Sequence, residues 1–111
     1  MVMARSSPFG GGTRTRVLLA LQLMDESYAR ELARLLGVGL SSVQSALRGL
    51  ERDGLVAARP AGRTRMYRLD PRYFALDELR RYLSRLAEPE RELLAVVTSM
   101  RRRPRRTGKP L

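Results

Sequence analysis

The first half of the chain alternates apolar and polar residues at the spacing of α-helices. Residues 14–24 predict a helix that follows a Thr13 cap and is apolar on more than one side, and such a helix packs on more than one side. In a small domain this pattern indicates a second packing partner, for which another subunit is one option. Residues 28–36 predict an amphipathic helix that is capped by Ser27 and ended by Gly37, because glycine accepts the left-handed conformation.

Residues 40–53 predict a third helix, which begins after Gly39 and stops at Gly54, since glycine suits both the start and the left-handed end of a helix. Its apolar residues recur at helical spacing and are the expected core positions: Val43, Ala46, Leu47 and Leu50. Its other face is rich in serine, which lowers helix propensity, so a functional role is favoured over ordinary solvent surface. Gly49 is also costly inside a helix and fits either a close approach to DNA or another helix, or sequence drift.

Two strands and a turn follow the third helix. Residues 56–59 and 64–69 predict the strands, and residues 60–63 predict the turn because they contain proline and glycine. Tyr67 and Leu69 are two positions apart and share one face of the second strand, which we assign to the core. The segment therefore predicts a β-hairpin directly after the third helix.

Leucines at helical spacing predict a further helix over residues 76–86, and Pro89 is placed to begin a last helix that ends near Met100. A core layer and a dimer interface both fit this apolar stripe. Because the preceding segments already supply a core, we favour association through residues 73–100, with aromatic side chains at the interface. The aromatic candidates are Tyr73, Phe74 and Tyr82.

Composition narrows the chemistry that the chain can perform. The sequence has no cysteine and no histidine, which excludes disulfides, zinc and iron–sulfur sites and histidine-dependent catalysis. Its 11 carboxylates form no cluster at the ligand spacing of Mg²⁺, so we expect no metal, no cofactor and no enzyme activity. No apolar run reaches the roughly 20 residues that span a bilayer, and residues 1–12 lack the apolar region of a signal peptide. We therefore expect a cytoplasmic protein without a membrane partner.

The charge balance indicates the kind of partner. Lys and Arg total 22 against 11 Asp and Glu, a net charge of +11, which favours a polyanion. Nearly all of these cations are arginines, a bias that the codon usage of a GC-rich genome explains. Residues 101–111 are basic and cannot form a core, so we expect a disordered tail that either only solubilises the protein or adds a nonspecific DNA clamp. Residues 1–12, which end in three glycines, predict a flexible arm.

Two short helices joined by a glycine-containing turn and followed by a hairpin make the layout of a winged helix-turn-helix, a mainly α fold with a small β-hairpin wing. The major groove of B-DNA accepts one α-helix, and its base edges need hydrogen-bonding side chains. The polar side chains of the third helix meet this need and are the candidates for base contact: Ser41, Ser42, Gln44, Ser45 and Arg48.

Arginines outside that set are candidates for contacts to phosphates. Arg52 lies further along the same helix. Arg30 and Arg34 lie one turn apart on the preceding helix, where a plain solvated face explains them equally well. Arg63 and Arg65 flank the turn of the wing, and a basic wing suits the minor groove or its phosphates.

Three segments resemble the winged helix-turn-helix of prokaryotic ArsR-like and MarR-like transcriptional regulators: residues 28–38 (YARELARLLGV), 42–56 (SVQSALRGLERDGLV) and, as the wing, 62–71 (GRTRMYRLDP). The resemblance covers about residues 13–72. It implies that residues 40–53 read the major groove and that the protein is a homodimer joined through terminal helices. Metal-sensing members use Cys or His ligands, which this sequence lacks, so metal sensing is not implied and the effector stays unknown.

We interpret the chain as four segments: a flexible arm (1–12), a winged helix-turn-helix DNA-binding domain (13–72), C-terminal dimerisation helices (73–100) and a basic disordered tail (101–111). The predicted function is sequence-specific binding of double-stranded DNA by a homodimeric transcriptional regulator, a repressor rather than an activator, associated with the nucleoid. A sequence-tolerant chromatin protein and a winged-helix protein-interaction module are the alternatives. RNA binding is disfavoured because few aromatics are available to stack unpaired bases.

Overall fold

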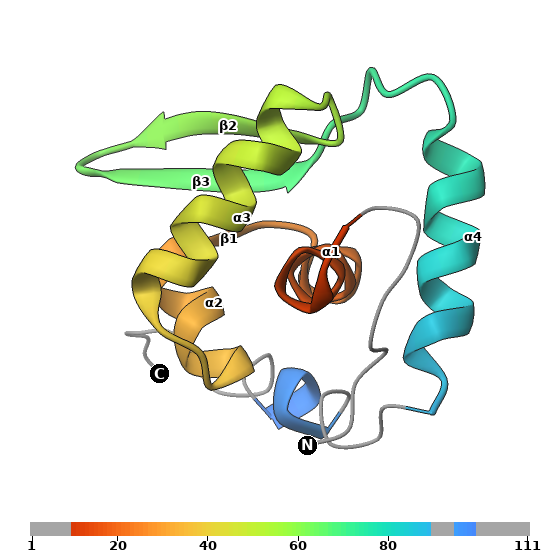
Figure 1. Ribbon diagram of the computed structural model, residues 1–111, viewed down its shortest axis with the longest axis horizontal. Helices are drawn as coiled ribbons and strands as arrows, with labels where there is room; N and C mark the ends of the chain where they lie inside the picture. The colour runs from red at the N-terminus through yellow and green to blue at the C-terminus, as the bar shows by residue number, and fades with distance from the viewer. Residues whose placement is uncertain (1–9, 90–94, 100–111) are drawn as a thin grey trace, which may run out of the picture.

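Helix α1 (Gly12–Met24) lies at the centre of the structure, and the other elements surround it (Figure 1). The computed structural model describes residues 10–89 and 95–99. After α1 the elements follow in the order β1 (Ser27–Tyr28), α2 (Ala29–Leu36), α3 (Leu40–Arg52), β2 (Val56–Ala61), β3 (Thr64–Leu69) and α4 (Leu76–Ala87). Helices α3 and α4 flank α1 on opposite sides, and residues 95–99 are also helical.

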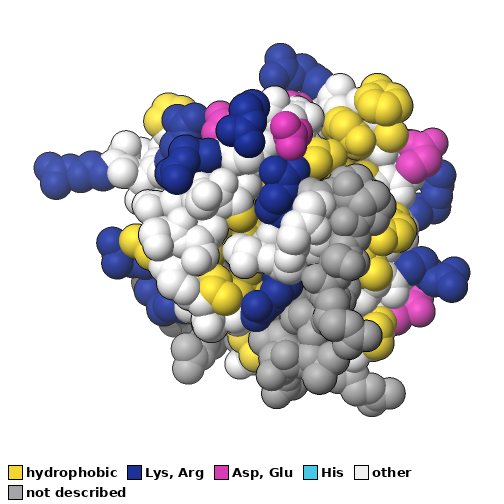
Figure 2. All heavy atoms as spheres, viewed as in Figure 1, with side chains coloured by type: hydrophobic (Ala, Val, Ile, Leu, Met, Phe, Trp, Pro, Cys, Tyr) yellow, Lys and Arg dark blue, Asp and Glu magenta, His cyan; other side chains and the backbone are white. Residues whose placement is uncertain are grey.

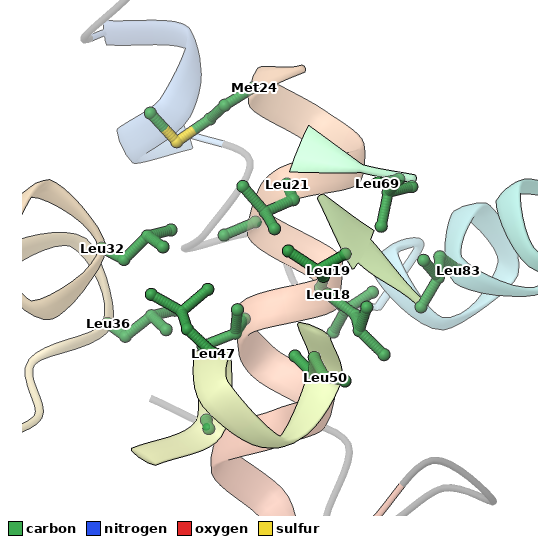
Figure 3. Packing of buried hydrophobic residues seen from close by; sticks show 14 of the residues in the cluster. Leu18, Leu19, Leu21, Met24, Leu32, Leu36, Leu47, Leu50, Leu69 and Leu83 are labelled. Carbon is green, nitrogen blue, oxygen red and sulfur yellow. The ribbon is translucent and has the colours of Figure 1, made fainter. Parts of the chain in front are cut away.

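The core forms around α1 because this helix is apolar on several sides. Val17, Leu18 and Leu19 are completely buried, and Figure 3 shows leucines of α2, α3, β3 and α4 gathered around the helix. The predicted packing on more than one side is therefore confirmed. The second partner, however, is α4 of the same chain, so burial of α1 does not require another subunit.

The leucine stripe of α4 forms a core layer on its inward face. Leu79 and Leu83 are 3% and 0% exposed. A polar link joins the same two helices, since Nε2 of Gln22 in α1 donates to Oγ of Ser84 in α4 at 3.1 Å. This face of α4 belongs to the core, so association through the described part of this helix would use its other faces.

Glycines set the turn between α2 and α3 and the end of α3, as predicted. Gly37 has a left-handed φ of 67° at the C-cap of α2, and Gly39 is the N-cap of α3. Gly54 has a φ of 84°, and the N–H of Leu55 donates to the carbonyl of Leu50 at 2.9 Å, which is the hydrogen bond of a Schellman stop. Local backbone chemistry thus fixes where α3 begins and ends.

Two predicted helix caps are wrong. Thr13 lies inside the first turn of α1, whose N-cap is Gly11. Ser27 belongs to β1, a strand that the sequence did not predict, and pairs with Tyr67 in β3. Its buried Oγ donates to Oε1 of Glu31 at 2.5 Å. Ser27 is held in extended backbone by pairing with a strand far along the chain, and α2 therefore starts later than predicted.

The three antiparallel strands lie in the order β1-β3-β2, and the β2–β3 hairpin is the wing. Ala61 pairs with Thr64, so the turn is shorter than predicted and consists of Gly62 and Arg63, while Pro60 lies in β2. Gly62 has a φ of 65°, a value that glycine adopts without strain. Of the two predicted core residues of β3, Tyr67 is half-buried and Leu69 is buried.

The predicted arm, tail and last helix lie largely outside the part of the chain that the structure describes, which omits residues 1–9, 90–94 and 100–111. Helix α1 already begins at Gly12, the last residue of the predicted arm. Val97, which belongs to the apolar stripe predicted for the last helix, is buried. Among the described helices, none is both long and apolar enough to cross a membrane.

Candidate nucleic-acid interface

Helix α3 divides into a buried apolar side and an exposed polar side. Val43, Leu47 and Leu50 are completely buried against the core. All six predicted polar residues are exposed: Ser41, Ser42, Gln44, Ser45, Arg48 and Arg52. Figure 2 shows a broad area without charge on this side of the molecule, with arginine side chains around its edge. Small and hydrogen-bonding side chains inside a cationic rim are what a helix needs to approach base edges between two phosphate backbones.

The beginning of α3 adds hydrogen-bond donors to this surface. The N-cap Gly39 has no side chain to occupy the start of the helix. The first backbone N–H groups of a helix have no intrahelical acceptor and carry partial positive charge, so they favour a phosphate. Ser41 and Ser42, in the first turn of α3, are exposed at the same end.

The two arginines of the wing have different surroundings. Arg63 is exposed at the tip of the hairpin. Arg65 donates from Nη2 to Oε2 of Glu51 in α3 at 3.0 Å, and its guanidinium lies 5.9 Å from the centre of the Tyr67 ring. Arg65 therefore braces the wing against α3, a role that the sequence did not indicate, while Arg63 presents its charge at the end of the wing.

The two arginines of α2 are exposed. Arg30 is exposed, and Arg34 donates from Nη2 to the phenolic oxygen of Tyr28 at 3.4 Å. They lie on a helix that packs beside α3. Their exposure fits a contact to phosphate and a plain solvated face equally well.

An arginine that sequence reasoning missed lies beside the exposed face of α3. Arg14, in the first turn of α1, donates from Nη2 to Oδ2 of Asp53 at 2.7 Å. A cleft of about 590 Å³ lies between the first turn of α1 and α3. Gly49 was the sequence feature that pointed to this approach of Arg14, because a Cβ atom built at Gly49 would lie 2.5 Å from Nη1 of Arg14. The close approach that Gly49 indicated is therefore to a side chain of another helix.

Two further arginines hold the elements around this surface in place. Arg16 of α1 donates from Nη2 to the carbonyl of Leu36 at 2.6 Å, which is at the C-terminal, partially negative end of α2. Arg59 of β2 donates to both carboxylate oxygens of Glu26, at 2.8 Å each. The hydrogen bonds from Arg59 lower the pKa of Glu26, and Glu26 in turn raises the pKa of Arg59. These contacts join α1 to α2 and the end of α1 to the wing.

The structure has the features of a winged helix-turn-helix protein. These are two short helices, an exposed polar face on the second helix, and a hairpin that is braced against that helix. Comparisons with known proteins agree. Residues 11–65 match the model of the MarR family, whose members are transcriptional regulators rather than enzymes. The chain is therefore a winged-helix transcriptional regulator that matches the MarR family model over residues 11–65. Comparison with curated protein sequences finds no match.

Solved structures of regulators share the fold. Reduced HlyU from Vibrio cholerae N16961 is 28% identical over 71% of this chain and 77% of that chain, with a TM-score of 0.58. The transcriptional regulator HlyU from Vibrio vulnificus CMCP6 is 27% identical over 68% and 73% of the chains, with a TM-score of 0.56. The winged helix-turn-helix domain of Mb0332 from Mycobacterium bovis, described as homodimeric and DNA-binding, is 21% identical over 90% and 79%, with a TM-score of 0.53, a likeness of fold.

Proposed function

We propose that this protein binds double-stranded DNA with sequence preference, as a homodimer, and represses transcription by occupying its site. The observation that carries the proposal is the exposed face of α3, which is polar along its whole length and has a basic wing on one side. A mutant of Lactococcus lactis ZitR has a similar fold, with 15% identity and a TM-score of 0.61, and its structure is described as a complex with DNA.

In this proposal each arginine and polar residue has one of three tasks. The exposed residues of α3 contact base edges in the major groove, where Gln pairs with adenine and Arg with guanine: Ser41, Ser42, Gln44, Ser45 and Arg48. Phosphate contacts come from α2 and from the end of α3: Arg30, Arg34 and Arg52. The wing adds Arg63 at or near the minor groove, and Arg65 contributes through its hold on the wing as well as its charge.

The homodimer is proposed from exposed aromatic surface beside α4. Phe74 is 91% exposed, and Tyr82 is 36% exposed. The ring of Phe74 lies 5.1 Å from that of Tyr73, centre to centre, and exposed apolar patches mark interaction surfaces. A two-fold dimer would present two copies of α3 to half-sites roughly 34–36 Å apart. Such binding would place the protein at the nucleoid in the cytoplasm, and the signal that controls it is left open.

Selection of bound duplexes from a random pool, at low and at physiological salt, tests the proposal. We expect enrichment of a sequence that is roughly palindromic. Binding without enrichment would instead favour a sequence-tolerant chromatin protein. Absence of duplex binding at physiological salt would overturn DNA binding and favour a protein-interaction module.

Replacing the arginine at the wing tip should weaken binding to all sequences alike. Arg63→Ala removes one exposed charge without touching the brace between Arg65 and Glu51. We expect a several-fold loss of affinity and a decrease of about one in the slope of log affinity against log salt, measured by fluorescence anisotropy. Arg63→Ala combined with Arg65→Ala should lose more, because the wing is then also detached from α3. Unchanged binding by the double variant would rule out the wing as a DNA contact.

Replacing the glutamine of α3 should change preference rather than overall affinity. Gln44 is exposed on α3, so Gln44→Ala should leave folding intact. If the side chain pairs with a base, repeated selection will show relaxed preference at one position of each half-site, worth about 1–3 kcal/mol there. A loss that is equal for all sequences would mean that Gln44 does not read a base.

A further inference from the structure

Two arginine side chains converge over Gly49, on the side of α3 that faces α1. A Cβ atom at Gly49 would lie 2.5 Å from Nη1 of Arg14 and 3.6 Å from Nη2 of Arg52. The two guanidinium groups come from different helices, and glycine leaves room for both. Glycine inside a helix is unfavourable by about 1 kcal/mol relative to alanine. The space for the two guanidinium groups is therefore obtained at a cost to the stability of α3.

Among the described residues, the carboxylate that lies beside both cations is that of Asp53. Asp53 accepts from Arg14 at 2.7 Å, and its second oxygen is 4.0 Å from Nε of Arg52, a weak contact. The side chain of Arg52 remains 75% exposed. Guanidinium groups are well suited to bind phosphate oxygens, so two of them at one place, one of them largely exposed, favour an anionic ligand.

The space beside these arginines is a shallow cleft that is broadly open to solvent. It has a volume of about 590 Å³ and is lined by both arginines, by the first turn of α1 and by serines of α3. The serines are Ser41, Ser42 and Ser45. Serine hydroxyls, guanidinium groups and the first N–H groups of a helix are all donors to phosphate oxygens.

We propose that this cleft holds a backbone phosphate of the DNA strand that borders α3, so that the first turn of α1 is a wall of the DNA interface. The inference rests on the proposed function and extends it to a helix outside the helix-turn-helix. The cleft shares its three serines with the exposed face of α3. A duplex lying against that face would pass its backbone along the cleft on one side and along the wing on the other.

Thr13→Asp is the sharpest test because it separates DNA binding from folding. Thr13 lines the cleft in the first turn of α1, where a carboxylate stabilises a helix through its dipole. The same carboxylate would repel a phosphate in the cleft. We expect an unchanged or higher melting temperature, an affinity for a short random-sequence duplex about tenfold lower, and a salt slope smaller by about one.

Arg72→Ala is the matched control. Arg72 lies between β3 and α4, its side chain is 87% exposed and it does not line the cleft, so this variant changes the net charge equally at another place. We expect affinity within about twofold of the unmodified protein, well short of a tenfold change. Equal affinities for Thr13→Asp and Arg72→Ala would overturn the phosphate site.

Gly49→Ala tests the convergence itself. The methyl group would displace the guanidinium of Arg14, the flexible end of a long side chain, while improving the helix propensity of α3. We expect Gly49→Ala to retain the stability of the unmodified protein and to bind DNA several-fold more weakly. The slope of log affinity against log salt should be reduced as it is for Thr13→Asp. If Thr13→Asp and Gly49→Ala bind normally while Arg48→Glu, on the exposed face and outside the cleft, abolishes binding, the cleft proposal fails and the proposed function stands. If all three bind normally, the proposed function fails as well.

Discussion

Leu83→Ala should destabilise the protein by about 2–5 kcal/mol, the usual range for a buried leucine. Leu83 is completely buried on α4 and belongs to the cluster that surrounds α1. The substitution leaves a cavity between two helices that also meet through Gln22 and Ser84, so closure of the cavity is restricted. Since domains of this size unfold with only about 5–15 kcal/mol, the loss should be visible as a lower urea midpoint by circular dichroism.

The control for this prediction is Arg81→Ala. Arg81 is exposed on the same helix, where its contact with Glu78 is 3.8 Å long, a surface pair of the kind that contributes between 0 and about 1 kcal/mol. We expect a change within about 0.5 kcal/mol. If Leu83→Ala were equally neutral, α4 would not be a layer of the core, and the interpretation of its stripe as an interface between subunits would return.

The helix-turn-helix and the wing were predictable because their signals are local. Gly37 and Gly54 mark helix ends whose left-handed backbone the residue type itself allows. The spacing of apolar residues separated the buried side of α3 from its exposed side. Such patterns depend on neighbours one turn away, and the fold did not overrule them.

The features that the sequence missed depend on contacts between distant segments. Ser27 has the residue type of a cap, but its place in β1 is set by pairing with Tyr67. The second partner of α1 is α4, far along the chain, and no apolar pattern distinguishes it from another subunit. Arg14 meets Asp53 across 39 positions, and only the unexplained Gly49 hinted at that approach. Periodicity identifies which faces are buried and leaves their partners undetermined.

Ser45→Glu should abolish DNA binding while leaving the fold intact. Ser45 is exposed on α3, one turn after Ser41 and one turn before Arg48. Glutamate is a better helix former than serine, so we expect an unchanged or slightly higher melting temperature. Facing the DNA, the introduced carboxylate would oppose phosphates and acceptor atoms of the bases. Like charges brought together at an interface cost several kcal/mol, and about 1.4 kcal/mol corresponds to a factor of ten, so affinity should drop by about a hundredfold or more.

Arg81→Ala again serves as the control, because it changes the net charge by the same one unit on α4. Pairing of the new carboxylate with Arg48 would withdraw a cation from the DNA, and an unpaired carboxylate would repel phosphates, so either outcome acts against binding. The measurement is anisotropy titration with the duplex recovered by selection and with a random duplex. We expect Arg81→Ala to bind both duplexes like the unmodified protein and Ser45→Glu to bind neither. Equal affinity of the two variants would exclude α3 as the helix that enters the groove, because an unpaired carboxylate buried at the centre of a DNA contact face carries a large desolvation cost.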